Sequence, residues 1–336
     1  MPSARRILVV GPSWVGDMVM AQSLLKTLHE HDPAVVIDVL APGWSLPIIE
    51  RMPEAHQGFD LPTGHGELGW GKRRRVAERL KTIGYDQAIV LPRTLKSALV
   101  PWFAGIPRRT GYLGESRFGL INDRRPFNAE RLPQTVQRYV ALGLPPDAAQ
   151  PPPVSHPTLT VDRERQAILI DELGLNRDER FVAFMPGAEY GPAKQWPVAH
   201  YAALARALGR RGQRVLIFGS PKDAEVGSAI VGAAGDAAVN LCGRTQLADV
   251  IDLLALCDTA VTNDSGLMHV AAAVGTPLVA IYGSSTPGFT PPLSDAARIL
   301  HLGLACSPCF ERRCPLGHTQ CLTRIGVADV LACLPA

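Results

Sequence analysis

Aspartate 17 ends a glycine-containing loop that directly follows the first apolar run of the chain. The loop, residues 11–17, reads GPSWVGD, and apolar residues at helical spacing begin with Met18. Its glycines are spaced as in a phosphate-binding P-loop, but Asp17 and Met18 stand where that motif has lysine and serine or threonine, which argues against phosphate binding here. The dipole of the helix favours a charged carboxylate in its first turn, so Asp17 is a candidate to accept a proton from a substrate hydroxyl. The alternative, with equal weight, is that Asp17 merely caps its helix.

A second reactive side chain lies in the other half of the chain. Lys194 is one of two lysines after residue 157, and it stands in the segment PGAEYGPAKQWP, residues 186–197, between an apolar run and a helical pattern. Small residues let the backbone approach a ligand, and an ammonium group in a loop between strand and helix suits a phosphate. The alternative is an ordinary exposed lysine.

Two further loops of this half have the same setting. In the first, residues 218–225, Glu225 either binds ribose hydroxyls or is simply an acidic residue in the first turn of its helix. In the second, residues 262–269, we expect asparagine or aspartate to cap the helix and leave the first N–H groups, near Ser265 and Gly266, open to an anion. His269 follows one turn later on the same face, where it is either a ligand or a core histidine. Three such loops at one sheet edge predict a site for a nucleoside diphosphate.

Two parallel sheets are needed to hold these loops. Apolar runs alternate with helical patterns in both halves, which predicts an α/β fold with helices on both faces of each sheet. We expect strands at 6–11, 35–40, 88–91, 181–184, 214–219, 259–262 and 278–283, and helices at 17–30, 197–212, from about 222, at 247–256 and at 265–274. Ligands of such sheets bind at the carboxyl ends of the strands.

A proline-rich segment separates the two halves. Residues 144–157 contain six prolines, which exclude a helix or a central strand and predict a stiff linker. We therefore expect two domains, residues 1–157 and 158–336, facing each other across a ligand cleft.

The composition limits the class of protein. With 336 residues, 46% hydrophobic and 19% charged, the chain is too long for one ordinary core and too apolar to be disordered. A net charge of +3 argues against a nucleic-acid binder held by overall charge. There is no apolar run of the roughly 20 residues that a membrane span needs, and no secretory signal pattern, so we expect a cytoplasmic protein.

Several long strings resemble one known family. Residues 11–18, 96–101, 186–197, 263–272 and 289–294 resemble the lipopolysaccharide heptosyltransferases of glycosyltransferase family 9, and in particular the heptosyltransferase II group. The resemblance implies the GT-B fold of two Rossmann-like domains. It also implies an inverting transfer of L-glycero-D-manno-heptose from ADP-heptose to the first heptose of a Kdo–lipid A inner core, with no cofactor required.

The resemblance also assigns roles to residues. It makes Asp17 the general base, gives the first domain the acceptor and the second domain ADP-heptose. The donor-binding positions that it implies are Ser13, Lys194, Ser220, Glu225, Asp264, Ser265, Gly266, Leu267 and His269. The alternatives are heptosyltransferase I, another transferase of the family, or a non-catalytic module that binds nucleotide sugars or anionic lipids.

The basic residues of the first half fit an anionic acceptor. Residues 1–157 hold 19 Lys and Arg against 14 Asp and Glu, whereas residues 158–336 hold 15 against 17. We expect the acceptor, or the anionic inner face of the inner membrane, to meet a surface that includes Lys72, Arg73, Arg74, Arg75, Arg93 and Lys96, with further clusters at Arg108-Arg109 and Arg124-Arg125. The alternative is a solvated face with a chance excess of charge.

Cysteines gather near the end of the chain. All seven follow residue 240, which does not indicate a disulfide scaffold. Four residues could bind a structural zinc ion, Cys309, Cys314, His318 and Cys321, although reduced cysteines in a tight loop are the favoured alternative.

Overall fold

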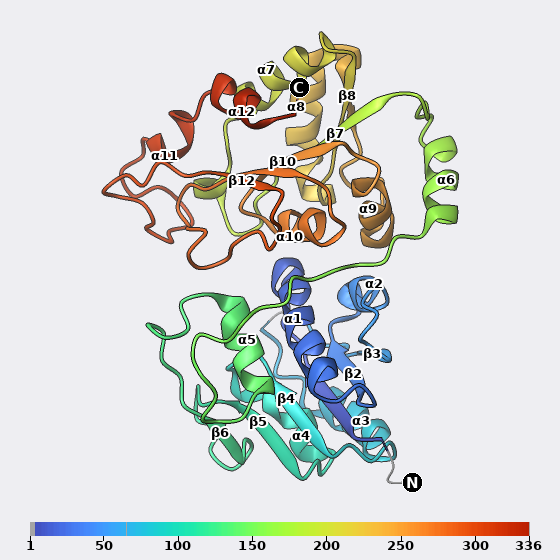
Figure 1. Ribbon diagram of the computed structural model, residues 1–336, viewed down its shortest axis with the longest axis vertical. Helices are drawn as coiled ribbons and strands as arrows, with labels where there is room; N and C mark the ends of the chain where they lie inside the picture. Colours follow the sequence, from blue (N-terminus) through green and yellow to red (C-terminus); the bar gives the residue numbers. More distant parts are fainter. Residues whose placement is uncertain (1–3, 65, 336) are drawn as a thin grey trace. The chain divides into compact units, whose positions relative to one another are not determined.

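The computed structural model describes residues 4–64 and 66–335, which divide into two compact units, residues 1–157 and 158–336 (Figure 1). The division follows the last proline of the 144–157 segment, and this segment contains neither helix nor strand. Each unit is built from parallel strands joined by helices. None of the helices in the described ranges is long and apolar enough to span a bilayer.

The first unit has one six-stranded parallel sheet in the order β3-β2-β1-β4-β5-β6. Its strands are β1 (Arg6–Val10), β2 (Val36–Ala41), β3 (Gln57–Asp60), β4 (Gln87–Val90), β5 (Arg108–Tyr112) and β6 (Asp123–Arg125). In the register, Val9 lies beside Val39 of β2 on one side and beside Ile89 of β4 on the other. The strand order reverses between β1 and β4, and such a switch point is where doubly wound sheets bind ligands.

Helices cover this sheet. They are α1 (Val15–His31), α2 (Leu46–Ile49), α3 (Trp70–Lys81), α4 (Leu99–Phe103) and α5 (Thr135–Gly143), with short 3₁₀ turns η1 (Gly43–Ser45) and η2 (Leu95–Ala98). Leu8 and Val10 of β1 share a buried cluster with apolar residues of α3 and α4, while α1 packs against α5. The run Ile7–Val10 is buried throughout, as a central parallel strand requires.

The second unit repeats this plan. Its sheet has the order β12-β11-β10-β7-β8-β9, which is the same arrangement with β7 in the place of β1 and β10 in the place of β4. The strands are β7 (Arg180–Met185), β8 (Gln213–Ile217), β9 (Ala238–Asn240), β10 (Thr259–Asn263), β11 (Leu278–Ile281) and β12 (Ala297–Leu300). The helices are α6 (Arg163–Glu172), α7 (Val198–Gly209), α8 (Ala224–Ala234), α9 (Leu247–Leu254), α10 (Gly266–Ala273), α11 (Gln320–Thr323) and α12 (Val327–Cys333), with 3₁₀ turns η3 (Pro192–Lys194), η4 (Pro221–Asp223) and η5 (Gly235–Ala237).

All the predicted strands and helices are present, with ends that differ by a few residues. The strands that the sequence did not predict are β3, β5, β6, β9 and β12, all outside the central pairs of their sheets. These strands are short or polar, such as RRTGY in β5 and DRR in β6, so hydrophobic patterning does not reveal them.

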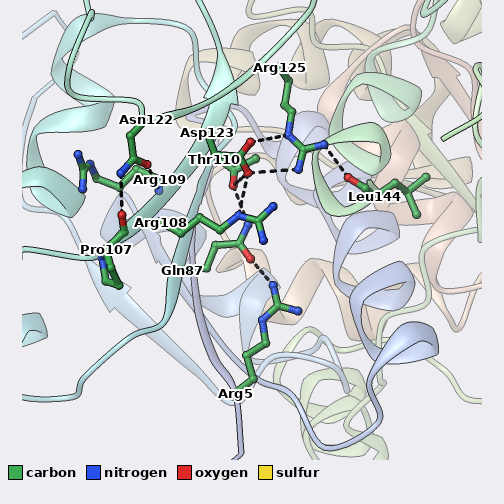
Figure 2. Close-up of polar contacts among 10 residues, drawn as sticks. All are labelled: Arg5, Gln87, Pro107, Arg108, Arg109, Thr110, Asn122, Asp123, Arg125 and Leu144. Atoms are coloured by element: carbon green, nitrogen blue, oxygen red, sulfur yellow. Dashed lines mark hydrogen bonds and ion pairs between the residues drawn. The ribbon is translucent and has the colours of Figure 1, made fainter. Parts of the chain in front are cut away.

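Charged side chains hold the polar outer strands of the first sheet together (Figure 2). Asp123 accepts hydrogen bonds from Arg108 at 2.8 Å, Arg125 at 3.0 Å and Thr110 at 2.8 Å. Burial acts to raise the pKa of Asp123, but hydrogen bonds from Thr110, Arg125 and Arg108 lower it overall. Arg125 also donates to the carbonyl of Leu144 at 2.7 Å, where α5 ends. The network replaces the apolar contacts that β6 lacks.

Candidate active site

Asp17 lies at the switch point of the first sheet, in the first turn of α1 directly after β1. The N-cap of α1 is Trp14, so Asp17 does not occupy the capping position. The backbone at Gly11 packs against the side chain of Met18, because a Cβ on Gly11 would lie 2.6 Å from the Cε of Met18. Ser13 is exposed and Asp17 is half-buried, so both remain accessible within this unit.

Tyr139 of α5 donates a hydrogen bond to the carboxylate of Asp17. Burial, together with the negative charge of Asp17, raises the pKa of Tyr139 well above its ordinary value, so the phenol stays protonated and remains a donor. The packing of α1 against α5 brings the two residues together. Nothing in the sequence pattern pointed to Tyr139.

A loop after β4 borders the same switch point and carries two predicted acceptor residues. Arg93 is exposed, lies over the ring of Phe127 at 4.5 Å and donates to the carbonyl of Leu113 at 3.2 Å, while Lys96 is half-buried. Arg93 and Lys96 therefore follow β4, which pairs with β1, the strand that leads to Asp17.

A fully buried arginine, which sequence reasoning missed, fixes this loop. Arg117 donates to the carbonyl of Pro92 at 2.7 Å and to the hydroxyl of Ser97 at 3.3 Å, and it also bonds the carbonyl of Tyr112. Burial, reinforced by the charge of Arg93, lowers the pKa of Arg117 to about 10, so the guanidinium stays charged at neutral pH.

Not all of the predicted basic surface faces solvent. Arg73 is only 3% exposed, because its guanidinium turns inward to the carbonyl of Leu68 at 2.7 Å and to the hydroxyl of Thr63 at 3.3 Å. We correct the expectation that it presents its charge alongside Lys72, Arg74 and Arg75. Arg74 and Arg75 are exposed, and Lys72 is half-buried beside Glu67 at 3.0 Å.

In the Arg108-Arg109 and Arg124-Arg125 clusters, three of the four side chains have partners inside the unit, although only Arg125 is buried and Arg108 stays half exposed. Arg108 and Arg125 pair with Asp123 as described above, and the guanidinium of Arg109 donates to the carbonyls of Leu120 at 2.7 Å and Ile106 at 2.6 Å (Figure 2). Of these four arginines, only Arg124 is an exposed side chain with no such contact among the described residues. Part of the positive charge of the first unit therefore serves internal hydrogen bonds and ion pairs within that unit.

Lys194 and Asp264 form the centre of the corresponding switch point in the second unit. The Nζ of Lys194, which follows β7, lies 2.5 Å from Oδ2 of Asp264, which follows β10. Asp264 is buried and also accepts hydrogen bonds from Ser285 and, at 3.4 Å, from Thr290. The side chain of Lys194 remains 16% exposed, so its ammonium is both oriented and accessible.

Ser265 occupies the N-cap position of α10, where we expected Asn263 or Asp264. Asn263 instead holds the β7 loop: its Oδ1 accepts from the backbone N–H of Trp196 at 3.0 Å, and its Nδ2 donates to the carbonyl of Pro186 at 2.7 Å. The side chain of Ser265 makes no capping hydrogen bond. The first turn of α10, with Gly266 and Leu267 half-buried, thus begins beside the Lys194–Asp264 pair without a side-chain cap.

His269 is buried on α10 near the same pair. Burial, with an added effect from the charge of Lys194, lowers its pKa to about 4 although Asp264 acts in the opposite direction. The imidazole is therefore neutral at physiological pH. As a donor-binding residue it remains a prediction, since its burial also fits a core histidine.

The β8 loop lies beside the β7 loop. Asp223 of the β8 loop packs closely against Gly187 of the β7 loop, because a Cβ on Gly187 would lie 2.5 Å from Oδ1 of Asp223. Lys222 also forms an ion pair with Glu189 at 2.6 Å. Ser220 bonds the Asp223 carboxylate through its hydroxyl at 2.8 Å, while Glu225 is exposed in the first turn of α8. The three predicted loops thus follow β7, β8 and β10 at one edge of one sheet.

The cysteine-containing segment packs against the β7 loop. The backbone N–H of Ala193 donates to the carbonyl of Arg312 at 3.1 Å, and the hydroxyl of Tyr190 donates to the carbonyl of Phe310. The ring of Tyr190 lies 5.0 Å from the ammonium of Lys194 and 5.4 Å from the guanidinium of Arg312. Arg312 is thus a second cation near Lys194 that sequence reasoning missed.

The predicted zinc ligands do not form a metal site in this structure. Across residues 4–64 and 66–335, no three His, Cys, Asp or Glu side chains are grouped as metal ligands are. Backbone N–H groups, that of Thr319 first, lower the pKa of Cys314, and the Nδ1 of His318 accepts from the N–H of Gln320 at 3.0 Å. Zinc binding by Cys309, Cys314, His318 and Cys321 stays a prediction without structural support.

Comparison with known proteins identifies the family. The model for glycosyltransferase family 9 (heptosyltransferase) matches residues 73–320. Lipopolysaccharide heptosyltransferase 2 of Escherichia coli K12 is 48% identical over 306 residues, 88% of each chain, and lipopolysaccharide heptosyltransferase 1 of Pseudomonas aeruginosa is 27% identical over 94% of this chain and 89% of its own. The solved structure of E. coli ADP-heptose lps heptosyltransferase II matches 98% of this chain and 97% of its own with a TM-score of 0.87 and 43% identity, which confirms the GT-B fold class. The chain belongs to glycosyltransferase family 9, the heptosyltransferases.

Proposed function

We propose that this protein is a lipopolysaccharide heptosyltransferase of the type named heptosyltransferase 2, which transfers heptose from ADP-heptose to the first heptose of the Kdo–lipid A inner core. One observation carries the proposal: each sheet presents one reactive side chain at its switch point, a carboxylate in the first unit and an ammonium in the second. The chain is 48% identical to a heptosyltransferase 2 and 27% identical to a heptosyltransferase 1. This difference favours the monoheptosylated acceptor over Kdo–lipid A that carries no heptose.

Asp17 acts as the general base. The acceptor hydroxyl attacks the anomeric carbon of heptose on the side opposite to ADP, which inverts that centre. As the new C–O bond forms, the proton of the hydroxyl passes to Asp17. Tyr139 holds the carboxylate in place through its hydrogen bond.

Lys194 stabilises the leaving group. The bond between the anomeric carbon and the diphosphate breaks with its electron pair on oxygen, so negative charge grows on ADP. The ammonium of Lys194, oriented by Asp264, and the uncapped N–H groups at the start of α10 offer fixed positive ends to that charge. Because these groups can stabilise the negative charge on the leaving ADP, we propose that the transfer needs no metal or organic cofactor. Addition of EDTA should therefore leave turnover unchanged.

The acceptor binds the first unit. Arg93 and Lys96, held by Arg117 beside the switch point, suit the carboxylates and phosphates of the inner core, as do the exposed Arg74 and Arg75. Because such an acceptor is anchored in lipid, we propose that the protein works at the cytoplasmic face of an anionic membrane.

A transfer assay tests the proposal. Purified protein is incubated with ADP-heptose and either Kdo2–lipid A or its monoheptosylated form, and products are identified by mass spectrometry. We expect one added heptose on the monoheptosylated acceptor alone. Transfer to Kdo2–lipid A would indicate heptosyltransferase 1 activity, and ADP-heptose binding without any transfer would indicate a non-catalytic module.

A further inference from the structure

Three neighbouring aromatic side chains lie at the surface of the first unit, where α3 and α4 pack together. Trp70 begins α3 and is 51% exposed, and Trp102 of α4 is 45% exposed. Phe103 connects them, with ring centroids 5.0 Å from Trp70 and 5.1 Å from Trp102. We call Trp70, Trp102 and Phe103 the aromatic patch. Contiguous exposed aromatic residues on a folded unit indicate a contact surface.

Phe103 packs against the buried core of the unit, whereas Trp70 and Trp102 lie outside the core cluster. Val76, Ala77 and Leu80 form the buried face of α3 and join the cluster that includes Leu8 and Val10. That face anchors the helix, so the two exposed tryptophans are not needed to hold α3 in place.

Positive charge borders the aromatic patch. Helix α3 contains six basic residues and one acidic residue. At 3.6 residues per turn, Trp70, Arg74 and Lys81 lie along one side of the helix. Arg74 has only an exposed contact with Glu78 at 3.4 Å, and no described carboxylate pairs with Lys81. Exposed pairs of this kind contribute little, so the charge of this side is available to a partner.

We propose that the aromatic patch and the basic side of α3 dock this protein onto an anionic lipid bilayer, with the tryptophans at the headgroup level. The inference rests on the proposed function, whose acceptor is held in a membrane. Tryptophan concentrates at membrane interfaces, and helices with Lys or Arg beside Trp and Phe bind them. A second copy of the chain fits less well, because the same positive charge would meet itself.

Vesicle binding tests the docking directly. Wild-type protein and the double variant W70S/W102S are floated with vesicles of phosphatidylethanolamine and phosphatidylglycerol (7:3), and with phosphatidylethanolamine and phosphatidylcholine (7:3) as the uncharged case. We expect the wild type to prefer the anionic vesicles and the variant to bind them about tenfold more weakly. The matched control is Ile168→Ser, which removes an exposed apolar side chain of α6 in the other unit and should bind as the wild type does.

Two charge-reversal variants test how much the basic side of α3 contributes to vesicle binding. R74E/K81E reverses two charges on the side of α3 that begins with Trp70, and R210E/R211E reverses two exposed arginines of the second unit. We expect the first to weaken binding by about tenfold or more and the second to have little effect, because a basic residue must lie near the surface to attract anionic lipid. Equal losses in both variants would show that net charge alone drives binding and would overturn the docking surface.

A measurement on the unaltered protein covers the case in which a variant fails to fold. Tryptophan fluorescence of the wild type should be quenched by phosphatidylglycerol brominated at the top of its acyl chains, since Trp70 and Trp102 at the headgroup level would lie next to those bromines. Absence of quenching on bound vesicles would contradict insertion. Sedimentation of the wild type and W70S/W102S without lipid detects self-association through the patch, which would equally overturn the proposal.

Activity separates this inference from the proposed function. With a delipidated, water-soluble monoheptosyl acceptor, W70S/W102S should turn over as the wild type does, whereas with acceptor in vesicles its rate should fall about tenfold. If the wild type binds vesicles through the aromatic patch but transfers no heptose to either acceptor, the proposed function fails and the docking surface stands.

Discussion

The ammonium of Lys194 lies 2.5 Å from a carboxylate oxygen of Asp264, and the pair joins the loops that follow the two strands of the switch point in the second sheet. Asp264 is itself held by Ser285 and Thr290. The cation is therefore oriented before any phosphate arrives, and little of its side-chain freedom is left to lose on binding.

Removing either member of this pair should reduce donor use. We expect Lys194→Gln to lower kcat/KM for ADP-heptose by about 10²-fold to 10³-fold, as loss of a group that stabilises developing charge commonly does. Asp264→Asn should cost less, about tenfold, because the ammonium remains but is no longer oriented. The control is Lys222→Gln, the other lysine of the unit, whose exposed pair with Glu189 makes it dispensable. Losses as large in Lys222→Gln would refute the role of Lys194.

Asp17→Asn should fold and bind ADP normally yet lose about 10³-fold or more in kcat, because the amide cannot accept the acceptor proton. Tyr139→Phe removes only the hydrogen bond to Asp17 and should lower kcat by about tenfold. Steady-state kinetics and calorimetric ADP binding separate chemistry from binding. Turnover of Asp17→Asn near the wild-type rate would rule out Asp17 as the base.

His269 should make the second unit sensitive to acid. Its pKa is about 4 in the folded state and about 6.5 when unfolded, so the unfolded chain binds more protons between these values. The stability that this group contributes is complete above pH 6.5 and is lost as the pH falls toward 4, by up to about 3 kcal/mol. Urea unfolding at pH 7.5 and pH 5 should show a smaller pH effect in His269→Gln than in the wild type. The same pH effect in both would mean that His269 is not responsible.

Arg117→Met should destabilise the first unit by about 3 kcal/mol, because it leaves the buried carbonyl of Tyr112 and the partly buried carbonyl of Pro92 without their donor. Arg124→Met changes an exposed arginine nearby and should stay within about 0.5 kcal/mol of the wild type. Urea denaturation followed by circular dichroism compares the two. If Arg117→Met matched Arg124→Met, the buried guanidinium would not be what fixes the loop after β4.

Cys314 should be the most reactive thiol of the protein. Backbone N–H groups lower its pKa, whereas burial raises the pKa of Cys242 to about 12 and that of Cys257 further. Alkylation with iodoacetamide at pH 7.5, followed by mass spectrometry, should label Cys314 first and these two last. The metal content of the same untagged protein should be measured alongside, since a bound zinc ion would protect Cys314 from alkylation until a chelator is added.

The main reactive residues could be predicted because they follow continuous apolar strands. β1, β7 and β10 are buried from end to end or nearly so, and the segments that directly follow them contain Asp17, Lys194 and Asp264. In a parallel sheet, that position alone places a side chain at the ligand-binding edge.

Other features depend on packing that no local pattern encodes. Tyr139 reaches Asp17 only because α5 packs on α1, and Arg117 is buried only because its loop returns to the end of β4. Four consecutive basic residues looked equivalent in the sequence, yet the helical period turns Arg73 toward the interior and leaves Arg74 and Arg75 outside. Asp123 likewise pairs with Arg108 and Arg125, two arginines that the charge count alone places on a ligand-binding surface, although only Arg125 is buried.

The identical strand order of the two sheets has a practical consequence. Every strand pair lies within one unit, and the hydrogen-bonded ladders of β1–β6 and β7–β12 share no member. Chimeras joined in the proline segment, which exchange residues 158–336 with those of a relative that uses another sugar nucleotide, keep each ladder whole. Such exchanges would make the choice of donor a property that can be moved from one enzyme to another.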